Sequence, residues 1–158
     1  MSDPSASAPL PTETPPPWMN SLMTVALRTP GIRSAIGKRI ALITFTGRRS
    51  GATYTTPITY MREGDTVTML TKRFRTWWRN FENEPAVGLV LAGRTVTGVA
   101  TATVGSDEVI DEVCSFLEYN SQDAKAYNIP IEEGIVDRDA IRTILPDLVL
   151  IEVELATT

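Results

Sequence analysis

The chain contains no histidine and only one cysteine, Cys114, among its 158 residues. These absences exclude a Ser-His-Asp triad, a histidine-ligated metal site and an imidazole general base, so most hydrolytic mechanisms are ruled out and no metal site is predicted. A disulfide within the chain and a CxxC redox pair are excluded as well. We interpret Cys114 as a small buried hydrophobic residue. Redox chemistry remains open, because an organic cofactor can carry the electrons while the protein orients it.

Long hydrophobic runs are also missing, since no apolar stretch approaches the ~20 residues needed to span a bilayer. Residues 1–17 are rich in Pro, Ser, Ala and Thr and contain no Lys or Arg, so they lack the basic start of a secretory signal. We expect these residues to form a disordered tail. We expect residues 18–158 to form a single domain, and the protein to be cytoplasmic.

The charge is small overall and unevenly distributed. Fifteen Lys and Arg against 19 Asp and Glu give −4, which argues against a nucleic-acid partner because phosphate backbones require a basic surface. Residues 46–80 carry seven basic and two acidic side chains, or +5, whereas residues 81–158 carry four basic and fifteen acidic side chains, or −11. The seven basic residues are Arg48, Arg49, Arg62, Lys72, Arg73, Arg75 and Arg79. We therefore expect the middle of the chain to bind an anion.

Branched and aromatic runs separated by turn residues predict a mainly β fold. The expected strands are residues 40–46, 53–61, 66–71, 87–91, 95–104 and 148–155, and the expected short helices are residues 18–27, 32–38, 77–81, 106–119 and 137–145. This order indicates an antiparallel barrel of about six strands with helices at one side, an α+β arrangement. The lack of βαβ alternation and of GxGxxG argues against a Rossmann fold.

Three positions within these elements carry further expectations. Pro57 is expected at a strand edge or bulge, and Ser106 is expected to cap the helix that follows it. The amphipathic helix at residues 18–27 is expected either to cap the barrel or to contact a partner or the inner face of a membrane.

Two basic turns are candidate anion-binding elements. The first joins two strands and consists of Gly47, Arg48, Arg49, Ser50 and Gly51, whose N–H groups, hydroxyl and guanidinium groups could hold phosphate or carboxylate oxygens. The second, residues 71–75, follows the third strand and could face the same groove. Each turn could equally be a solvated charged loop.

Aromatic side chains provide the other half of a cofactor site. Trp77 and Trp78, with Asn80 nearby, offer flat apolar surface and a two-way hydrogen-bonding amide, which suit an isoalloxazine-like ring. The phenols are Tyr54, Tyr60, Tyr119 and Tyr127. We take Tyr119 and Tyr127, in the segment 106–135 that we expect to fold over the barrel mouth, as candidate proton donors.

These motifs, in this order, resemble the deazaflavin-dependent nitroreductase family of actinobacteria. The resemblance rests on Thr46-Gly47-Arg48-Arg49-Ser50-Gly51, Pro57, Gly64-Asp65, Trp77-Trp78-Arg79-Asn80 and Asn83-Glu84-Pro85-Ala86-Val87. It implies a split β-barrel of the FMN-binding type, often dimeric, that binds coenzyme F420. It also implies hydride transfer to a small-molecule acceptor such as a quinone, a nitroaromatic compound or another activated alkene.

Carried over position by position, the resemblance implies a set of cofactor-binding residues and one further candidate catalytic residue. The cofactor-binding residues would be Gly47, Arg48, Arg49, Ser50, Gly51, Pro57, Lys72, Arg73, Trp77, Trp78 and Asn80. Thr71 stands where family members often have a serine near the ring, so it joins Tyr119 and Tyr127 as a candidate catalytic residue. The chain departs from the family where Thr71-Lys72-Arg73-Phe74-Arg75 replaces the usual S-K-G-G loop, and altered ring binding is the expected consequence.

Two alternatives stay open at this point. The first keeps the fold and replaces F420 with FMN, whose single phosphate needs fewer cations. The second is a non-enzymatic carrier of a lipid, haem or flavin-like ligand, which the missing loop glycines favour.

Overall fold

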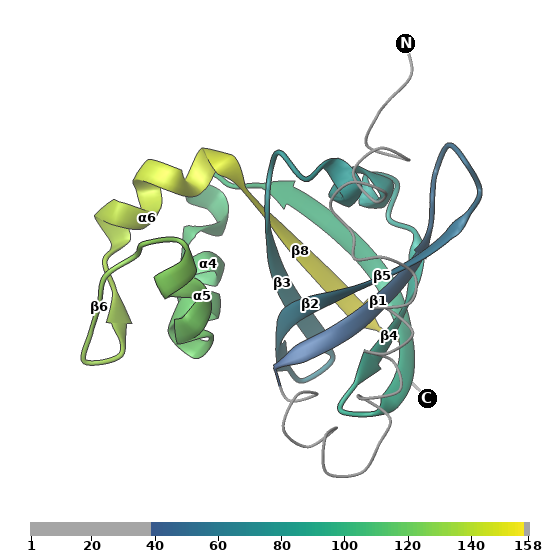
Figure 1. The fold of residues 1–158 in the computed structure, drawn as a ribbon, viewed down its shortest axis with the longest axis horizontal. Helices are drawn as coiled ribbons and strands as arrows, with labels where there is room; N and C mark the ends of the chain where they lie inside the picture. Colours follow the sequence, from purple (N-terminus) through teal and green to yellow (C-terminus); the bar gives the residue numbers. More distant parts are fainter. Residues whose placement is uncertain (1–38, 157–158) are drawn as a thin grey trace.

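The computed structural model describes residues 39–156, which form a six-stranded antiparallel barrel and a helical lobe beside it (Figure 1). The barrel strands are β1 (Ile40–Thr46), β2 (Thr53–Glu63), β3 (Thr66–Lys72), β4 (Ala86–Leu91), β5 (Arg94–Val104) and β8 (Leu148–Leu155). They close in the order β1-β2-β3-β8-β5-β4. The predicted fold class and all six predicted strands are confirmed. The predictions for residues 1–17, 18–27 and 32–38 lie outside the described residues.

Alternation along the strands fills the barrel with apolar side chains. The interior cluster draws on every strand, with residues such as Ile43, Phe45, Met69, Leu89 and Ile151 almost fully buried. The 3-10 helix η1 (Thr76–Phe81) adds Trp77, Trp78 and Phe81 to this cluster. The helix predicted at residues 77–81 therefore exists, in the tighter 3-10 form, and it contributes to the core.

The barrel is split between β2 and β3. β2 pairs with β1 over Thr53–Thr59, but its pairing with β3 covers only Tyr60–Glu63. β3 continues along β8 to Lys72, so its last residues diverge from the first half of β2. Pro57, which has no N–H to donate, lies in the half of β2 that is open on one side, as predicted for an edge position.

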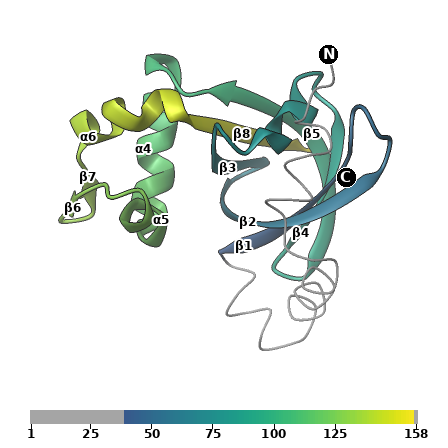
Figure 2. The same ribbon diagram turned by 45° about the horizontal axis from the view of Figure 1, so that its top comes forward.

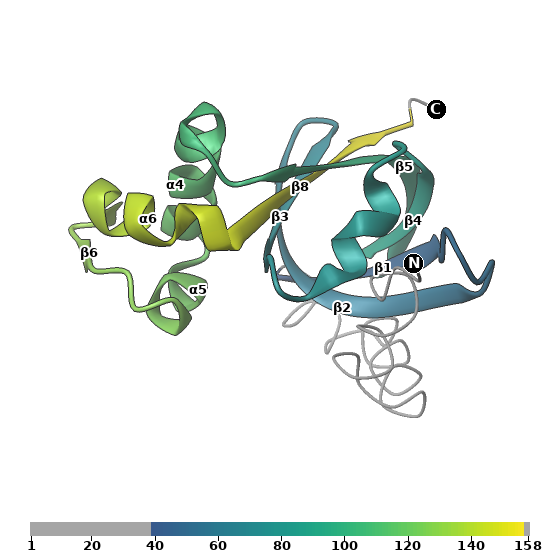
Figure 3. The same cartoon turned by 90° about the horizontal axis from the view of Figure 1, so that it is seen from above.

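The helical lobe is inserted between β5 and β8 and lies to one side of the barrel in all three ribbon views (Figures 1, 2 and 3). It consists of η2 (Asp107–Val109), α4 (Ile110–Tyr119), α5 (Ser121–Ala126), β6 (Ile131–Glu132), β7 (Ile135–Val136), α6 (Arg138–Ile144) and η3 (Leu145–Asp147). Its core packs on the outer face of the barrel through Met61, Leu70, Leu148 and Leu150. Cys114 is buried in this core, as predicted, and burial raises the pKa of its thiol, which keeps it protonated.

The sequence predictions for this lobe were partly wrong. Ser106 occupies the expected N-cap position, but its side chain makes no capping hydrogen bond, and the first turn is the 3-10 helix η2. Neither α5 nor the β6–β7 hairpin was predicted, because the short stretch between Asn120 and Val136 shows no clear periodicity. The helix predicted at residues 137–145 is confirmed as α6, with Asp137 as its N-cap.

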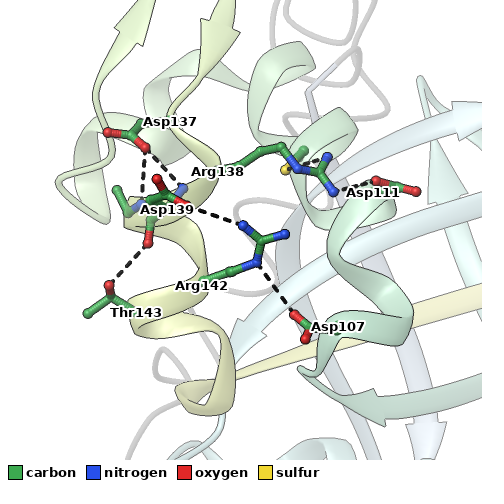
Figure 4. Close-up of polar contacts among 9 residues, drawn as sticks. Asp107, Asp111, Asp137, Arg138, Asp139, Arg142 and Thr143 are labelled. Atoms are coloured by element: carbon green, nitrogen blue, oxygen red, sulfur yellow. Dashed lines mark hydrogen bonds and ion pairs between the residues drawn. The ribbon is translucent and has the colours of Figure 1, made fainter.

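Charged side chains of α6 pair with α4, with η2 and within α6 itself (Figure 4). Arg138 pairs with Asp111 at 2.8 Å, and Arg142 pairs with Asp107 at 3.7 Å and with Asp139 at 3.2 Å. All of these carboxylates are exposed, so each pair stabilises the lobe only weakly.

The N-cap of α6 is the stronger local contact. Asp137 accepts hydrogen bonds from the N–H groups of Asp139 and Ala140 at 3.0 and 3.2 Å. We expect Asp137→Ala to lower the free energy of unfolding by about 1 kcal/mol, because these two N–H groups lose their acceptor. Asp137→Asn keeps an acceptor and serves as the control. Urea denaturation of both variants checks the prediction, and equal losses in the two would contradict it.

Within residues 39–156, no helix is both long and apolar enough to cross a bilayer.

Candidate functional site

A groove of about 370 Å³ opens where the barrel is split. One wall comes from β2, a second from the end of β3 with η1, and a third from α5. Its lining residues are Thr56, Pro57, Ile58, Thr59, Leu70, Thr71, Lys72, Arg75, Trp77, Asp123, Ala126 and Tyr127. The volume is in the range of small-molecule sites. The helical lobe therefore completes a pocket that the barrel begins.

The β3 side of the groove is basic and hydroxyl-rich. Thr71 and Lys72 end the strand, and Arg75 follows in the loop. Pro57, in the middle of β2, lines the same groove, but the first basic turn does not, so the expectation that both basic turns face one groove is wrong. The β3 side presents two cations to any ligand that enters.

Trp77 forms the aromatic part of the groove wall. Its ring stacks on Phe45 at 5.8 Å between centroids and meets Phe81 edge-on at 5.6 Å. Only 6% of Trp77 is exposed. The core therefore fixes this ring, and a ligand meets a preformed apolar surface.

The α5 side of the groove carries Asp123 and Tyr127, one helical turn apart. The backbone N–H of Tyr127 donates to the carbonyl of Asp123 at 3.0 Å, so both side chains project from one face of the turn. Lys72 Nζ lies 5.4 Å from the centre of the Tyr127 ring in a cation–π contact. This contact joins the β3 side to the α5 side across the groove.

Burial raises the pKa of both titratable groups on the α5 side. Burial, with the charge of Asp123 adding to it and Arg75 opposing it, raises the pKa of Tyr127 to about 12. The pKa of Asp123 is raised by burial, which outweighs the opposing charge of Arg39 and the hydrogen bond from Thr59. Tyr127 therefore keeps its phenolic proton at neutral pH and can act as a hydrogen-bond donor.

The basic turn at Gly47–Gly51 does not line this groove. The N–H groups of Gly47 and Gly51 donate within the turn, to Ala52 and Gly47, at 2.7 and 2.9 Å. That of Arg48 donates to Asn80 Oδ1 at 2.9 Å. Ser50 Oγ accepts from the N–H of Ala52 at 3.1 Å and lies 3.2 Å from the Tyr54 hydroxyl. What this turn offers a ligand is therefore chiefly the guanidinium groups of Arg48 and Arg49.

Asn80 and Trp78 are buried supports of the groove. Asn80 is 4% exposed, and its amide also donates to the Trp77 carbonyl at 2.8 Å, so it joins the basic turn to η1. Trp78 is 5% exposed and donates from Nε1 to the Arg73 carbonyl at 3.0 Å, which fixes the loop after β3. Neither side chain lines the groove, although both were predicted to contact the cofactor.

A second hollow of about 360 Å³ adjoins the groove behind Lys72 and Tyr127. Arg73 and Phe74 line it, together with residues of α6, η3 and β8. The Arg73 N–H donates to the Asp147 carbonyl at 2.7 Å, which ties the loop to the lobe. Phe74 is 63% exposed. The loop that replaces the family's glycines is thus held at both backbone groups of Arg73.

The predicted site residues therefore divide into groups. Pro57, Thr71, Lys72, Trp77 and Tyr127 meet in one groove. Arg73 lies in the adjoining hollow, Gly47–Gly51 lies beyond Asn80, and Tyr119 is 61% exposed at the end of α4, outside the groove.

Sequence reasoning missed Asp123, and it included Arg75 only as part of the basic turn at residues 71–75. No sequence motif includes Asp123, but it lines the groove. The spacing of Asp123 and Tyr127, four residues apart, was the available signal, but it has meaning only once α5 is known to be a helix.

A family described as F420H(2)-dependent quinone reductase matches residues 23–134 of the sequence. The chain belongs to this family. Every lining residue of the groove falls within the part that matches the quinone reductase family. Among curated proteins, none matches the chain.

Solved structures share the fold of this quinone reductase family member. Atu2129 of Agrobacterium tumefaciens, a protein of unknown function, superposes with a TM-score of 0.55 at 20% identity over 99% of this chain and 58% of its own length. An FMN-binding protein related to pyridoxamine 5'-phosphate oxidase, from Nostoc punctiforme, superposes with a TM-score of 0.52 at 12% identity over 89% of this chain and 81% of its own length. HutZ, the heme storage protein of Vibrio cholerae, superposes with a TM-score of 0.53 at 13% identity over 77% of this chain and 84% of its own length. This chain thus spans 58% of the length of Atu2129. At these identities the likeness establishes the FMN-binding type of split barrel and nothing about activity.

Proposed function

We propose that the chain binds coenzyme F420 in the groove and passes a hydride from the reduced cofactor to a quinone, a nitroaromatic compound or another activated conjugated acceptor. The family match supports the cofactor class. The observation that carries the proposal is the meeting of two cations, a fixed indole and a protonated phenol in one groove.

The side chains present fit an anionic, planar cofactor. Lys72 and Arg75 supply positive charge inside the groove, and the hydroxyl groups of Thr56 and Thr71 supply hydrogen-bonding partners. Trp77 supplies an apolar face that the core already orients. Arg48 and Arg49 stand beyond η1, where a long anionic tail could reach them. The seven basic residues of segment 46–80 favour this longer ligand over FMN.

When bound, the deazaflavin supplies the hydride, and the residues of the chain handle charge and protons. The Tyr127 hydroxyl can donate to an oxygen of the acceptor as that oxygen gains negative charge. Lys72, held against the Tyr127 ring, adds positive charge beside the same position. The groove is lined partly by apolar side chains, which exclude water and strengthen both interactions. No histidine or cysteine is needed for these roles.

The remaining parts of the proposal concern the setting of the reaction. We propose a cytoplasmic site of action and a small-molecule acceptor. The predicted contact of residues 18–27 with a membrane concerns residues outside the described part of the chain. We also propose that the protein forms a homodimer.

Titration of the purified protein with F420 and, separately, with FMN tests the proposal. We expect F420 to quench tryptophan fluorescence with a lower Kd than FMN, because the groove and the basic turn together provide more cations than one phosphate requires. Mixing the reduced F420 complex with menadione should then oxidise the cofactor. Binding of FMN alone would favour the FMN alternative, and binding without oxidation by any quinone or nitroaromatic compound would favour a carrier.

A further inference from the structure

Asp123 is a charged group in the groove to which the proposed hydride transfer gives no role. It projects from α5 between Thr59 and Tyr127, and the Thr59 hydroxyl donates a hydrogen bond to its carboxylate. Within residues 39–156, no ion pair includes Asp123. The charge of Arg39 favours the ionised carboxylate but does not outweigh the cost of its burial. The presence of this carboxylate on a ligand-binding surface therefore points to a role in binding.

The charges in the groove are separated by side. Lys72 and Arg75 belong to the β3 side, and Asp123 belongs to the α5 side with Tyr127. In the proposed function, the anionic cofactor is matched to the basic side. The acceptor then lies near Tyr127, where Lys72 contributes positive charge from the β3 side and Asp123 contributes negative charge from the α5 side.

We propose that Asp123 determines the charge of the acceptor, admitting neutral rings to the groove and rejecting rings that carry a sulfonate or carboxylate. This inference rests on the proposed function. Two negative charges within about 6 Å repel each other by enough, at the effective dielectric of a partly buried site, to change an affinity about tenfold or more. A repulsive group of this kind creates specificity by acting against the wrong ligand.

The kinetic test uses 1,4-naphthoquinone and 1,4-naphthoquinone-2-sulfonate as acceptors with reduced F420. We expect Asp123→Asn, which keeps the size of the side chain and an acceptor for Thr59, to raise kcat/KM for the sulfonate about tenfold. The value for the neutral quinone should change less than twofold. The quantity compared between variants is the ratio of kcat/KM for the sulfonate to kcat/KM for the neutral quinone. This comparison cancels the different intrinsic reactivity of the two quinones.

Two matched controls separate charge from structure. Glu133→Gln, on the turn between β6 and β7 and outside the groove, makes the same change in net charge and should leave the ratio unchanged. Thr59→Val removes the hydrogen bond to Asp123 but keeps the carboxyl group itself, and should also leave the ratio near that of the unaltered protein. A shift with Thr59→Val as large as that with Asp123→Asn would overturn the proposal in favour of a positioning role.

A binding measurement separates this inference from the proposed function. The fluorescent probes 1-anilinonaphthalene-8-sulfonate and N-phenyl-1-naphthylamine share a ring system and differ by one sulfonate. Asp123→Asn should tighten binding of the sulfonate about fivefold or more and leave the neutral probe within twofold, whether or not the protein oxidises F420. If turnover with F420 fails while this shift appears, the proposed function is wrong and the charge selection stands. If Asp123→Asn changes neither probe selectively, the charge selection is wrong.

Discussion

Tyr127→Phe should lower kcat for quinone reduction about 100-fold, while the Kd of F420 should change little. The substitution removes only the hydroxyl that we expect to donate to the acceptor oxygen, and a positioned proton donor typically contributes 10²–10⁴-fold. The phenylalanine ring still fills the groove wall and still offers a face to Lys72, whose Nζ lies 5.4 Å from the ring centre in the present structure. Single-turnover oxidation of reduced F420 by menadione measures this effect directly.

Tyr119→Phe is the matched control for this experiment. Tyr119 was an equal candidate from the sequence, but it is 61% exposed and does not line the groove, so its variant should retain full activity. The pH profile adds a second readout. Because the pKa of Tyr127 is raised to about 12, the phenol stays protonated and the rate should not fall between about pH 7 and 9 through its ionisation. A Tyr127→Phe enzyme as fast as the unaltered one would remove this tyrosine from the mechanism.

The barrel could be predicted from the sequence because its strands are defined by local patterns. Branched residues, alternation and turn residues such as Gly64 and Gly93, both with positive φ, fix the strands and the hairpins between them. The closing strand β8 could be predicted as an element, but its place between β3 and β5 comes from pairing over a long sequence separation. Local patterns do not determine such pairings, and the resemblance to a known family supplied only the split-barrel class.

The site could be predicted only in part, for a related reason. Thr71, Lys72 and Trp77 belong to motifs and were found, whereas Asp123 comes from α5, a six-residue helix without a clear pattern. Two motif residues that we expected to bind the cofactor are buried and have a structural role instead. Trp78 and Asn80 look like ligand-binding groups in the sequence, yet Trp78 Nε1 donates to the Arg73 carbonyl, and the Asn80 amide accepts from the Arg48 N–H and donates to the Trp77 carbonyl. A sequence shows which groups are present, and packing decides which of them a ligand can reach.

Removing both arginines of the first basic turn should weaken F420 binding more than tenfold. Arg48 and Arg49 stand beyond η1, and Asn80 links their turn by two hydrogen bonds to the backbone of Trp77, a wall of the groove. Arg48 pairs with Glu82 at 3.4 Å, but a surface pair of this kind is weak enough for an anionic tail to displace the carboxylate. Each charged hydrogen bond lost costs about 1.5–3 kcal/mol.

Arg62→Ala/Arg94→Ala is the matched control for the Arg48→Ala/Arg49→Ala double variant. It makes the same change in net charge at two exposed arginines outside the groove. Fluorescence titration should show a large loss of F420 affinity for the first pair only, with the loss shrinking as salt rises because it is electrostatic. The affinity for FMN, which has one phosphate and no acidic tail, should fall less in the Arg48→Ala/Arg49→Ala variant. Equal losses for the two double variants would mean that the turn contributes only general positive charge, and the tail would then have to be held by Lys72 and Arg75 inside the groove.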